Sequence, residues 1–179
     1  MWQHEDYDHN IIINDVSVLE LDEPLEFNEY VQPMKLAEQG KLVIPLIKMI
    51  LFNLGQDPVG GTECINSGWG STSDSAVSQM PNKLQYVMLP IVDRETCTAD
   101  YNGINGVDQG MVCAGQAAGG ISPCSGDSGG PLVCPGEDGE YYLAGIVSWG
   151  VIPCGQADKP GVFTNAGHYR DWIDMHIAM

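Results

Sequence analysis

The sequence predicts an all-β protein that ends in a helix. It contains 22 glycines and 11 prolines among 179 residues, and few segments follow the period of 3.6 residues that marks an amphipathic helix. Short runs of β-branched and aromatic residues are instead bounded by Gly, Pro, Asn or Asp, which is typical of strands joined by turns. A hydrophobic fraction of 44% and a mean hydropathy of −0.08 fit a soluble globular protein. The length suffices for one well-buried domain or two small packed barrels.

Six strands are predicted from these runs. The first covers 15–21 and follows the apolar run 11–13. The others cover 85–92, 111–114, 131–134, 141–149 and 161–164.

Two helices are predicted. Asp93 is a suitable N-cap for a short helix that continues to Tyr101, and the pairs Asn102-Gly103 and Asn105-Gly106 then signal turns. The last helix covers 168–177, because several apolar side chains share one of its faces, with His176 at the edge. These are Tyr169, Trp172, Ile173 and Ile177.

One segment does not fit this pattern. Residues 42–54 are almost wholly apolar, yet the segment is too short to span a bilayer and is interrupted by Pro45 and Lys48. It is a buried helix or strand, a membrane-surface helix, or translated non-coding sequence. The lack of a clear polar face disfavours the membrane-surface helix.

The charge of the chain restricts its partners. The formal net charge is −17, and the first thirty residues hold nine acidic residues and no lysine or arginine. Contacts to nucleic acid or to an anionic membrane surface need basic residues, so neither is expected as a partner. The acidic residues lack the spacing of a calcium loop, which favours a solvated surface over a metal site.

The cysteines indicate an oxidising compartment. There are six of them, with no CxxC pair and no histidine at the spacing of a zinc site. Disulfides are therefore favoured over a metal, and the protein is expected to be secreted. The first residues show neither the basic start nor the apolar run of a signal peptide. We therefore expect a mature or an incomplete form of a secreted protein.

The residues 124–131, Cys-Ser-Gly-Asp-Ser-Gly-Gly-Pro, are suited to nucleophilic catalysis. A serine hydroxyl needs an activating base and a site that stabilises the oxyanion it creates. Glycines on both sides of Ser128 allow a tight turn that leaves the hydroxyl open. They also let a substrate carbonyl approach the N–H groups of Gly126 and Ser128, the expected oxyanion hole.

Further motifs identify the family that this chain resembles. They are CINSGWG at 64–70, MVCAG at 111–115, GIVSWG at 145–150, KPGVFT at 159–164 and YRDWI at 169–173. With the serine motif, they resemble the chymotrypsin/trypsin family of serine proteases over nearly the whole chain. The resemblance implies two antiparallel β-barrels and hydrolysis of peptide bonds through an acyl-enzyme. It also implies polypeptide substrates, possible protein protease inhibitors, a monomer and no cofactor.

The resemblance divides the chain into three parts. Residues 1–33 would be the remnant of an incomplete first barrel, 34–60 an inter-barrel linker with the atypical apolar insertion, and 61–179 the second barrel with the C-terminal helix. Within the linker, the segment 42–54 is best interpreted as retained non-coding sequence, with a genuine buried insertion as the alternative. The family pattern also implies the disulfides Cys64–Cys134, Cys97–Cys113 and Cys124–Cys154.

The resemblance assigns roles to several residues. Asp15 matches the triad aspartate that orients an imidazole and stabilises its cation. Ser148 would support Asp15 by a hydrogen bond, and the backbone of Ser148, Trp149 and Gly150 would pair with an extended substrate.

The primary pocket is expected to be neutral. Ser122, six residues before the nucleophile, would lie at its base, where trypsin-like members carry an aspartate, and Gly150 and Gly161 would keep its walls open. A buried substrate cation would lack a partner here. We therefore expect cleavage after large apolar or aromatic residues.

The family's general base is not found in the sequence. It lies in an Ala-Ala-His-Cys segment about 45 residues before the aspartate, whereas 14 residues precede Asp15, and neither His4 nor His9 has those neighbours. We therefore expect an N-terminally truncated protease that is inactive as it stands, because Ser128 lacks a base. The alternatives are a non-catalytic homologue that acts as a binding module, or a product without function.

Overall fold

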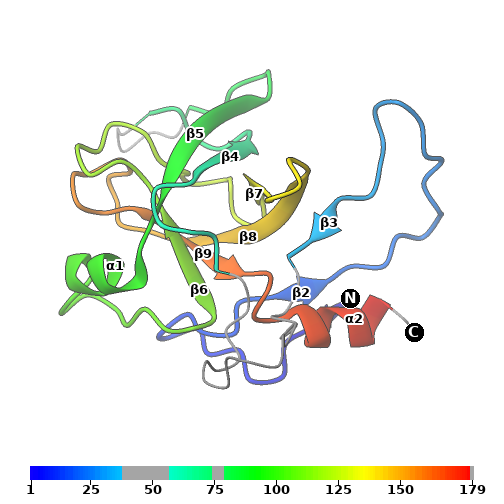
Figure 1. The fold of residues 1–179 in the computed structure, drawn as a ribbon, viewed down its shortest axis with the longest axis horizontal. Coiled ribbons are helices and arrows are strands. Elements are labelled where there is room, and N and C mark those ends of the chain that lie inside the picture. The colour runs from blue at the N-terminus through cyan, green and yellow to red at the C-terminus, as the bar shows by residue number, and fades with distance from the viewer. Residues whose placement is uncertain (38–56, 74–78, 178–179) are drawn as a thin grey trace, which may run out of the picture.

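The computed structural model describes residues 1–37, 57–73 and 79–177, and these form a mostly β structure with two short helices (Figure 1). In chain order the elements are β1 (Trp2–Gln3), β2 (Ser17–Val18), β3 (Lys35–Leu36), β4 (Glu63–Gly68), β5 (Gln85–Val92), α1 (Arg94–Asp100), β6 (Met111–Ala114), β7 (Pro131–Pro135), β8 (Tyr141–Trp149), β9 (Gly161–Asn165) and α2 (Arg170–Ile177).

Six antiparallel strands close into a barrel. The order β8-β7-β4-β5-β6-β9 returns to its start because β9 also pairs with β8. Side chains with little or no exposure fill the interior, among them Leu89, Leu132 and Phe163. This is the antiparallel barrel of a chymotrypsin-type fold, with α2 as the predicted C-terminal helix.

The parts of the chain before the barrel contribute little regular structure among the described residues. Residues 1–33 hold only β1 and β2, which pair with each other. The stretch predicted as a linker contributes β3, which pairs in parallel with β8 at the edge of the barrel sheet. The apolar segment 42–54 lies outside the described residues.

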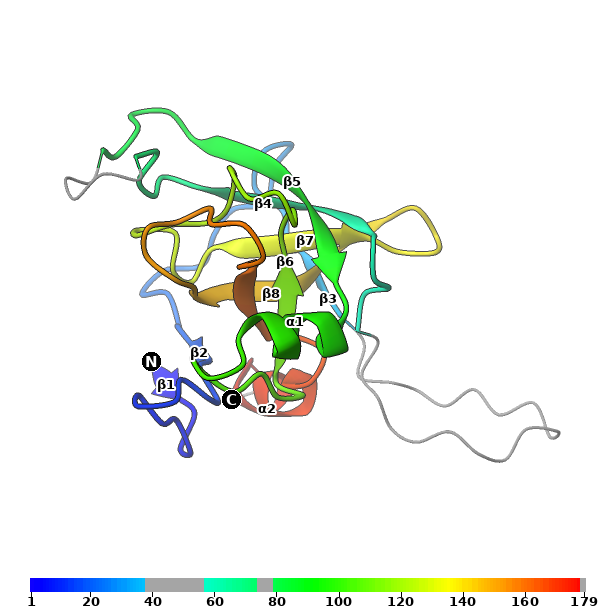
Figure 2. The same ribbon diagram turned by 90° about the vertical axis from the view of Figure 1, so that its left-hand side faces the viewer.

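The N-terminal segment packs against the C-terminal helix, as both views show for β2 and α2 (Figures 1 and 2). Val16 is buried in one cluster with Tyr169, Trp172 and Ile173. The ring of His4 stacks on Trp172 with 5.1 Å between the centroids. The residue that follows Asp15 is therefore packed against α2.

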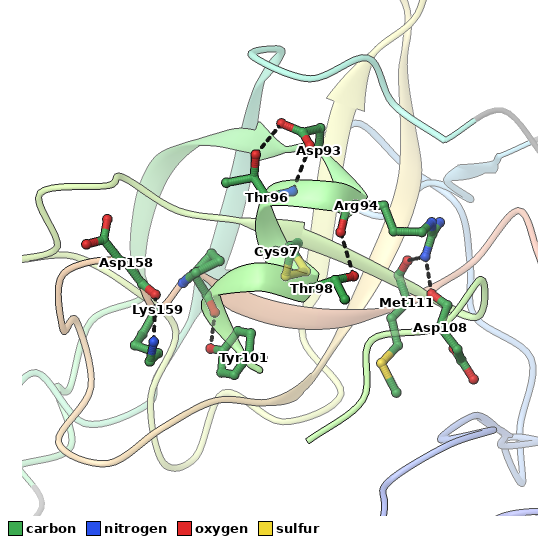
Figure 3. Close-up of a disulfide and its surroundings, with 12 residues drawn as sticks. Asp93, Arg94, Thr96, Cys97, Thr98, Tyr101, Asp108, Met111, Asp158 and Lys159 are labelled. Atoms are coloured by element: carbon green, nitrogen blue, oxygen red, sulfur yellow. Dashed lines mark hydrogen bonds between the residues drawn. A yellow bond between two sulfur atoms is a disulfide. The ribbon is translucent and has the colours of Figure 1, made fainter. Parts of the chain in front are cut away.

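The three disulfides connect the cysteines as expected: Cys64–Cys134, Cys97–Cys113 and Cys124–Cys154. The second joins α1 to β6 (Figure 3). Asp93 caps α1 as predicted, accepting the N–H of Thr96 at 2.9 Å.

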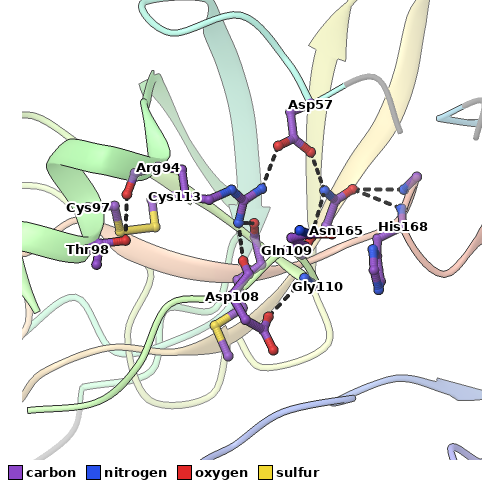
Figure 4. Close-up of polar contacts among 12 residues, drawn as sticks. Asp57, Arg94, Cys97, Thr98, Asp108, Gln109, Gly110, Cys113, Asn165 and His168 are labelled. Carbon is purple, nitrogen blue, oxygen red and sulfur yellow. Dashed lines mark hydrogen bonds and ion pairs between the residues drawn. A yellow bond between two sulfur atoms is a disulfide. The ribbon is translucent and has the colours of Figure 1, made fainter. Parts of the chain in front are cut away.

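A polar network anchors Asp57, near the end of the stretch predicted as a linker, to the barrel (Figure 4). The carboxylate of Asp57 forms an ion pair with Arg94 and accepts from the side-chain amide of Asn165. Arg94 also donates to the main-chain oxygens of Asp108 and Met111. Asn165 accepts the N–H groups of Gly167 and His168, which begin the turn into α2.

Most of the predicted strands occur where the sequence indicates them, but three details differ. The expected strand 15–21 shortens to Ser17–Val18, and the strand Glu63–Gly68 was missed because polar residues and glycine make up four of its six residues. The last helix begins at Arg170 and not at residue 168. Ile177 is 60% exposed, because Trp172 and Ile173 are the side chains of α2 that pack into the core.

Candidate active site

The turn that carries Ser128 is built by its own backbone hydrogen bonds. The N–H of Asp127 donates to Cys124 O at 2.9 Å, and that of Gly130 donates to Asp127 O at 2.8 Å. Gly126 has φ +98°, a conformation that glycine adopts without strain. Within the described residues, the N–H groups of Gly126 and Ser128 make no hydrogen bond, so both are available to an acceptor.

The carboxylate of Asp127 holds this turn in place from beneath. It accepts the N–H of Gly70 at 2.8 Å and that of Cys124 at 3.0 Å. A Cβ placed on Gly68 would lie 2.0 Å from Asp127 Oδ1, and one on Gly70 would lie 2.3 Å from Asp127 Cγ. Both glycines belong to the motif 64–70, but the sequence alone did not indicate that they make room for this carboxylate.

Asp15 is held by hydrogen bonds from two strands of the barrel. Ser148 on β8 donates its hydroxyl to Asp15 Oδ2 at 2.6 Å, the hydrogen bond expected from the resemblance. Thr164 on β9 donates to the main-chain oxygen of Asp15 at 2.6 Å. Asn14 next to it has φ +54° and accepts the hydroxyl of Tyr169 at 2.9 Å. Burial raises the pKa of Tyr169 to about 12, so the phenol keeps the proton it donates.

Asp15 and Ser128 border the same cavity. Its volume is about 580 Å³, and the rest of its wall is mostly apolar. It is lined in part by Met1, Tyr7, Leu19, Leu143, Ile146 and Val147. Ser128 and Asp15 therefore border a common space that is far larger than the roughly 150 Å³ that can hold a benzene molecule.

None of the four histidines lines a cavity that Ser128 borders, in the part of the chain that the structure describes. His4 stacks on Trp172, and His176 also packs on this ring, with 4.1 Å between centroids. His168 lies edge-on to Tyr169. His9 is exposed in the N-terminal segment.

A second cavity beside Ser128 has a volume of about 140 Å³. It is lined by Ser128, by Pro123–Ser125, and by the stretch 147–152, which includes Ser148, Trp149 and Gly150. No charged side chain lines it among the described residues. The residues of β8 that the sequence predicts for the site therefore border the same cavity as Ser128.

Two residues expected in the primary pocket lie beside this cavity instead. Ser122 borders a neighbouring cavity of about 390 Å³ that also contains Asp127, and its hydroxyl donates to Pro123 O at 2.9 Å. Gly161 packs on the ring of Pro123, where an added Cβ would lie 2.8 Å from Pro123 Cγ. Pro123, which the sequence did not single out, lines the cavity at Ser128 and contacts both residues.

Two other kinds of site were sought in residues 1–37, 57–73 and 79–177. No cluster of three or more His, Cys, Asp or Glu side chains there is arranged to bind a metal ion. No helix in these ranges has both the length and the apolar character needed to cross a bilayer.

Comparison with known proteins gives one consistent result. The family model described as Trypsin matches residues 1–173. The relatives include transmembrane protease serine 9 of Rattus norvegicus, 41% identical over 95% of this chain and 14% of that protein. Trypsin-1 of Astacus astacus is 38% identical over 95% of this chain and 62% of that protein, and trypsin Blo t 3 of Blomia tropicalis 39% over 95% and 57%. The chain thus spans less than two thirds of each of these relatives.

Proposed function

The chain belongs to the trypsin family of serine proteases, and from this premise we propose that it supplies the nucleophile, the orienting carboxylate, the oxyanion hole and the primary pocket of a serine endopeptidase. One observation carries the proposal. Asp15, oriented by the hydroxyl of Ser148 at 2.6 Å, borders the same cavity as Ser128. We propose that an imidazole bound in this cavity contacts both side chains.

In the proposed reaction, an imidazole takes the proton of Ser128 Oγ as this oxygen attacks the carbonyl carbon of the scissile bond. The N–H groups of Gly126 and Ser128 donate to the carbonyl oxygen as it becomes an oxyanion. The imidazolium then protonates the departing amine, which leaves an acyl-enzyme ester on Ser128. Water hydrolyses this ester by the same proton route, while Asp15 stabilises the imidazolium.

We propose that the imidazole comes from a histidine outside residues 1–179. The four histidines of the chain support this, because His4 and His176 pack on Trp172, His168 packs on Tyr169, and His9 is exposed away from the cavity walls. Without a base, Ser128 stays a protonated alcohol of low reactivity.

Chemical rescue with free imidazole tests this role. The chain is treated with a fluorophosphonate probe, and labelling of Ser128 is followed by mass spectrometry. Labelling is expected to be negligible alone, and to rise and then saturate as imidazole fills the cavity of about 580 Å³. Ser128→Ala should abolish the signal, and Asp15→Asn should reduce it by a factor of ten or more, roughly, because the imidazole loses its orienting carboxylate. Labelling of equal rate with and without imidazole would show that the chain carries its own base.

The alternative is a non-catalytic homologue that acts as a binding module. This alternative is favoured because, among the described residues, none of the four histidines lines either cavity that Ser128 borders, and three of them pack on aromatic rings elsewhere. If imidazole at saturating concentration produced no labelling of Ser128 in the folded chain, this alternative would be preferred.

The proposed specificity is for large apolar or aromatic side chains. The cavity beside Ser128 has no charged wall, and its 140 Å³ is close to the roughly 150 Å³ that accommodates one benzene ring. A substrate guanidinium would be desolvated there without a partner. With imidazole present, a phosphonate ending in Phe should therefore label Ser128 faster than one ending in Arg. The reverse order would contradict the proposed specificity.

We also propose that the protein is secreted and monomeric, acts on polypeptides and is open to protein protease inhibitors. The three disulfides support an oxidising compartment. Partition of the native protein between cells and medium, followed by size-exclusion chromatography, tests both points.

A further inference from the structure

The loop after α1 is tied to the N-terminal segment by Asn105. Its side-chain amide Nδ2 donates to the main-chain oxygen of Ile11 at 2.9 Å. The N–H of the next residue, Gly106, donates to Asn105 Oδ1 at 3.0 Å. The main-chain nitrogen of Gly106 is therefore held against the side-chain amide group of Asn105 in the native fold.

We propose that Asn105 is a site of spontaneous deamidation, and that the reaction loosens the segment that carries Asp15. The nitrogen of Gly106 attacks Asn105 Cγ and loses its proton. The Cγ–Nδ2 bond breaks, and Nδ2 leaves as ammonia. Water then opens the five-membered imide, giving aspartate if it attacks the side-chain carbonyl and isoaspartate if it attacks the main-chain carbonyl. Water is the only co-reactant.

The surroundings of Gly106 allow this ring to form. A Cβ placed on Gly106 would meet no atom within 4 Å apart from those of the two neighbouring residues, so the rest of the described structure does not hinder a shift of Gly106 toward the Asn105 side chain that its nitrogen already contacts at 3.0 Å. The residue lies in a stretch without helix or strand between α1 and β6, which leaves no ladder of backbone hydrogen bonds to resist the movement.

Deamidation removes the hydrogen bond that Asn105 donates to the main-chain oxygen of Ile11. The aspartate product carries a carboxylate oxygen where Nδ2 was, so a donor facing the Ile11 carbonyl oxygen is replaced by a second acceptor. In isoaspartate the main chain passes through Cγ and the free carboxylate is the former main-chain carbonyl, so the Nδ2 donor is lost there as well. The segment behind Ile11 depends on such contacts. Ile12 has φ +51°, a strained conformation for a β-branched residue, and it persists only where neighbouring contacts hold it.

The consequence for catalysis rests on the proposed role of Asp15, whereas the modification itself does not. Asp15 follows this segment directly, and the strained turn sets where its carboxylate meets Ser148. Deamidation would therefore act as a slow, irreversible release of the orienting carboxylate.

The first experiment measures the modification. The full chain is aged near neutral pH, and peptide mapping follows the conversion of Asn105. Gly106→Ala is the matched variant, because its Cβ meets open space but restricts the approach of the nitrogen. Conversion is expected in the wild type and about tenfold more slowly in the variant. An unfolded peptide of residues 102–108 serves as the reference. If Asn105 were still intact in the folded chain when Asn105 of the peptide had fully converted, the proposal would be overturned.

The second experiment measures the effect by hydrogen exchange. The reporters are the N–H groups of Asp8 and Ile13, which pair with each other's carbonyl oxygens at 3.2 and 3.3 Å. Asn105→Asp should exchange about fivefold to tenfold faster at both, as expected for a lost hydrogen bond that leaves a carbonyl unpaired. Asn102→Asp adds the same charge three residues earlier without touching Ile11, and should exchange like the wild type. Equal exchange in the two variants would overturn the proposed loosening. Neither readout depends on activity.

Discussion

Removing the carboxylate of Asp57 should destabilise the barrel far more than removing a more exposed surface carboxylate would. The variant Asp57→Ala leaves Asn165, which is 2% exposed, with its amide facing only the main-chain oxygen of Gln109 at 3.4 Å (Figure 4). A buried donor left without a good acceptor costs about 1–3 kcal/mol. Arg94 is less affected, because it keeps the Met111 oxygen at 3.0 Å and its ion pair with Asp57 is partly exposed, worth about 0–1 kcal/mol.

The expected loss of unfolding free energy is therefore about 2 kcal/mol, most of it from Asn165. Urea unfolding with the disulfides intact measures it, and with a slope of about 2 kcal/mol per molar the midpoint should fall by about 1 M. Asp57→Asn should lose only about half as much, because an amide oxygen still accepts from Asn165.

Asp138→Ala is the matched control. Its carboxylate pairs with Lys35 at 3.6 Å, but the two side chains are 64% and 61% exposed. Its removal should change the free energy of unfolding by at most about 0.5 kcal/mol. If Asp57→Ala and Asp138→Ala gave the same midpoint, the buried amide of Asn165 would not depend on Asp57, and the reasoning would fail.

Three further predictions concern the site and its supports. Ser148→Ala removes the donor at 2.6 Å from Asp15 and should slow imidazole-rescued labelling of Ser128 about tenfold at unchanged probe affinity, with recovery in Ser148→Thr. Gly70→Ala places a Cβ 2.3 Å from Asp127 Cγ and should displace this carboxylate from its hydrogen bond with the N–H of Cys124, in the turn that carries Ser128. Rescued labelling should then fall about a hundredfold, whereas Gly106→Ala leaves it unchanged. Burial raises the pKa of Tyr101 and Tyr169 from 10.0 to about 12, so the folded protein keeps protons that the unfolded chain releases. Their contribution, up to about 3 kcal/mol each, is present below about pH 10 and lost as the pH rises toward 12. Urea midpoints across this range should fall less steeply in Tyr101→Phe/Tyr169→Phe, and parallel curves would contradict the assignment.

The sequence by itself determined the features that depend on neighbouring residues. The turn that carries Ser128 needs glycines at fixed places beside the serine, and α1 needs a cap at Asp93, so both leave a local pattern. Strands β5, β6 and β8 were predicted for the same reason, since their β-branched and aromatic runs are bounded by turn residues. The pairing of the cysteines came from the family resemblance and is confirmed.

Only the tertiary structure decided which residues from distant parts of the chain contact one another. Gly161 packs on the ring of Pro123, which lines the cavity at Ser128, and the ring of His4 stacks on Trp172, yet no local pattern indicates either contact. Asp57 meets Asn165 across 108 positions of sequence, and neither residue belongs to a motif. Such contacts arise because the closed barrel brings its strands, its last helix and its N-terminal segment together. Their energies depend on burial and distance, which are properties of the folded chain and not of any window of residues.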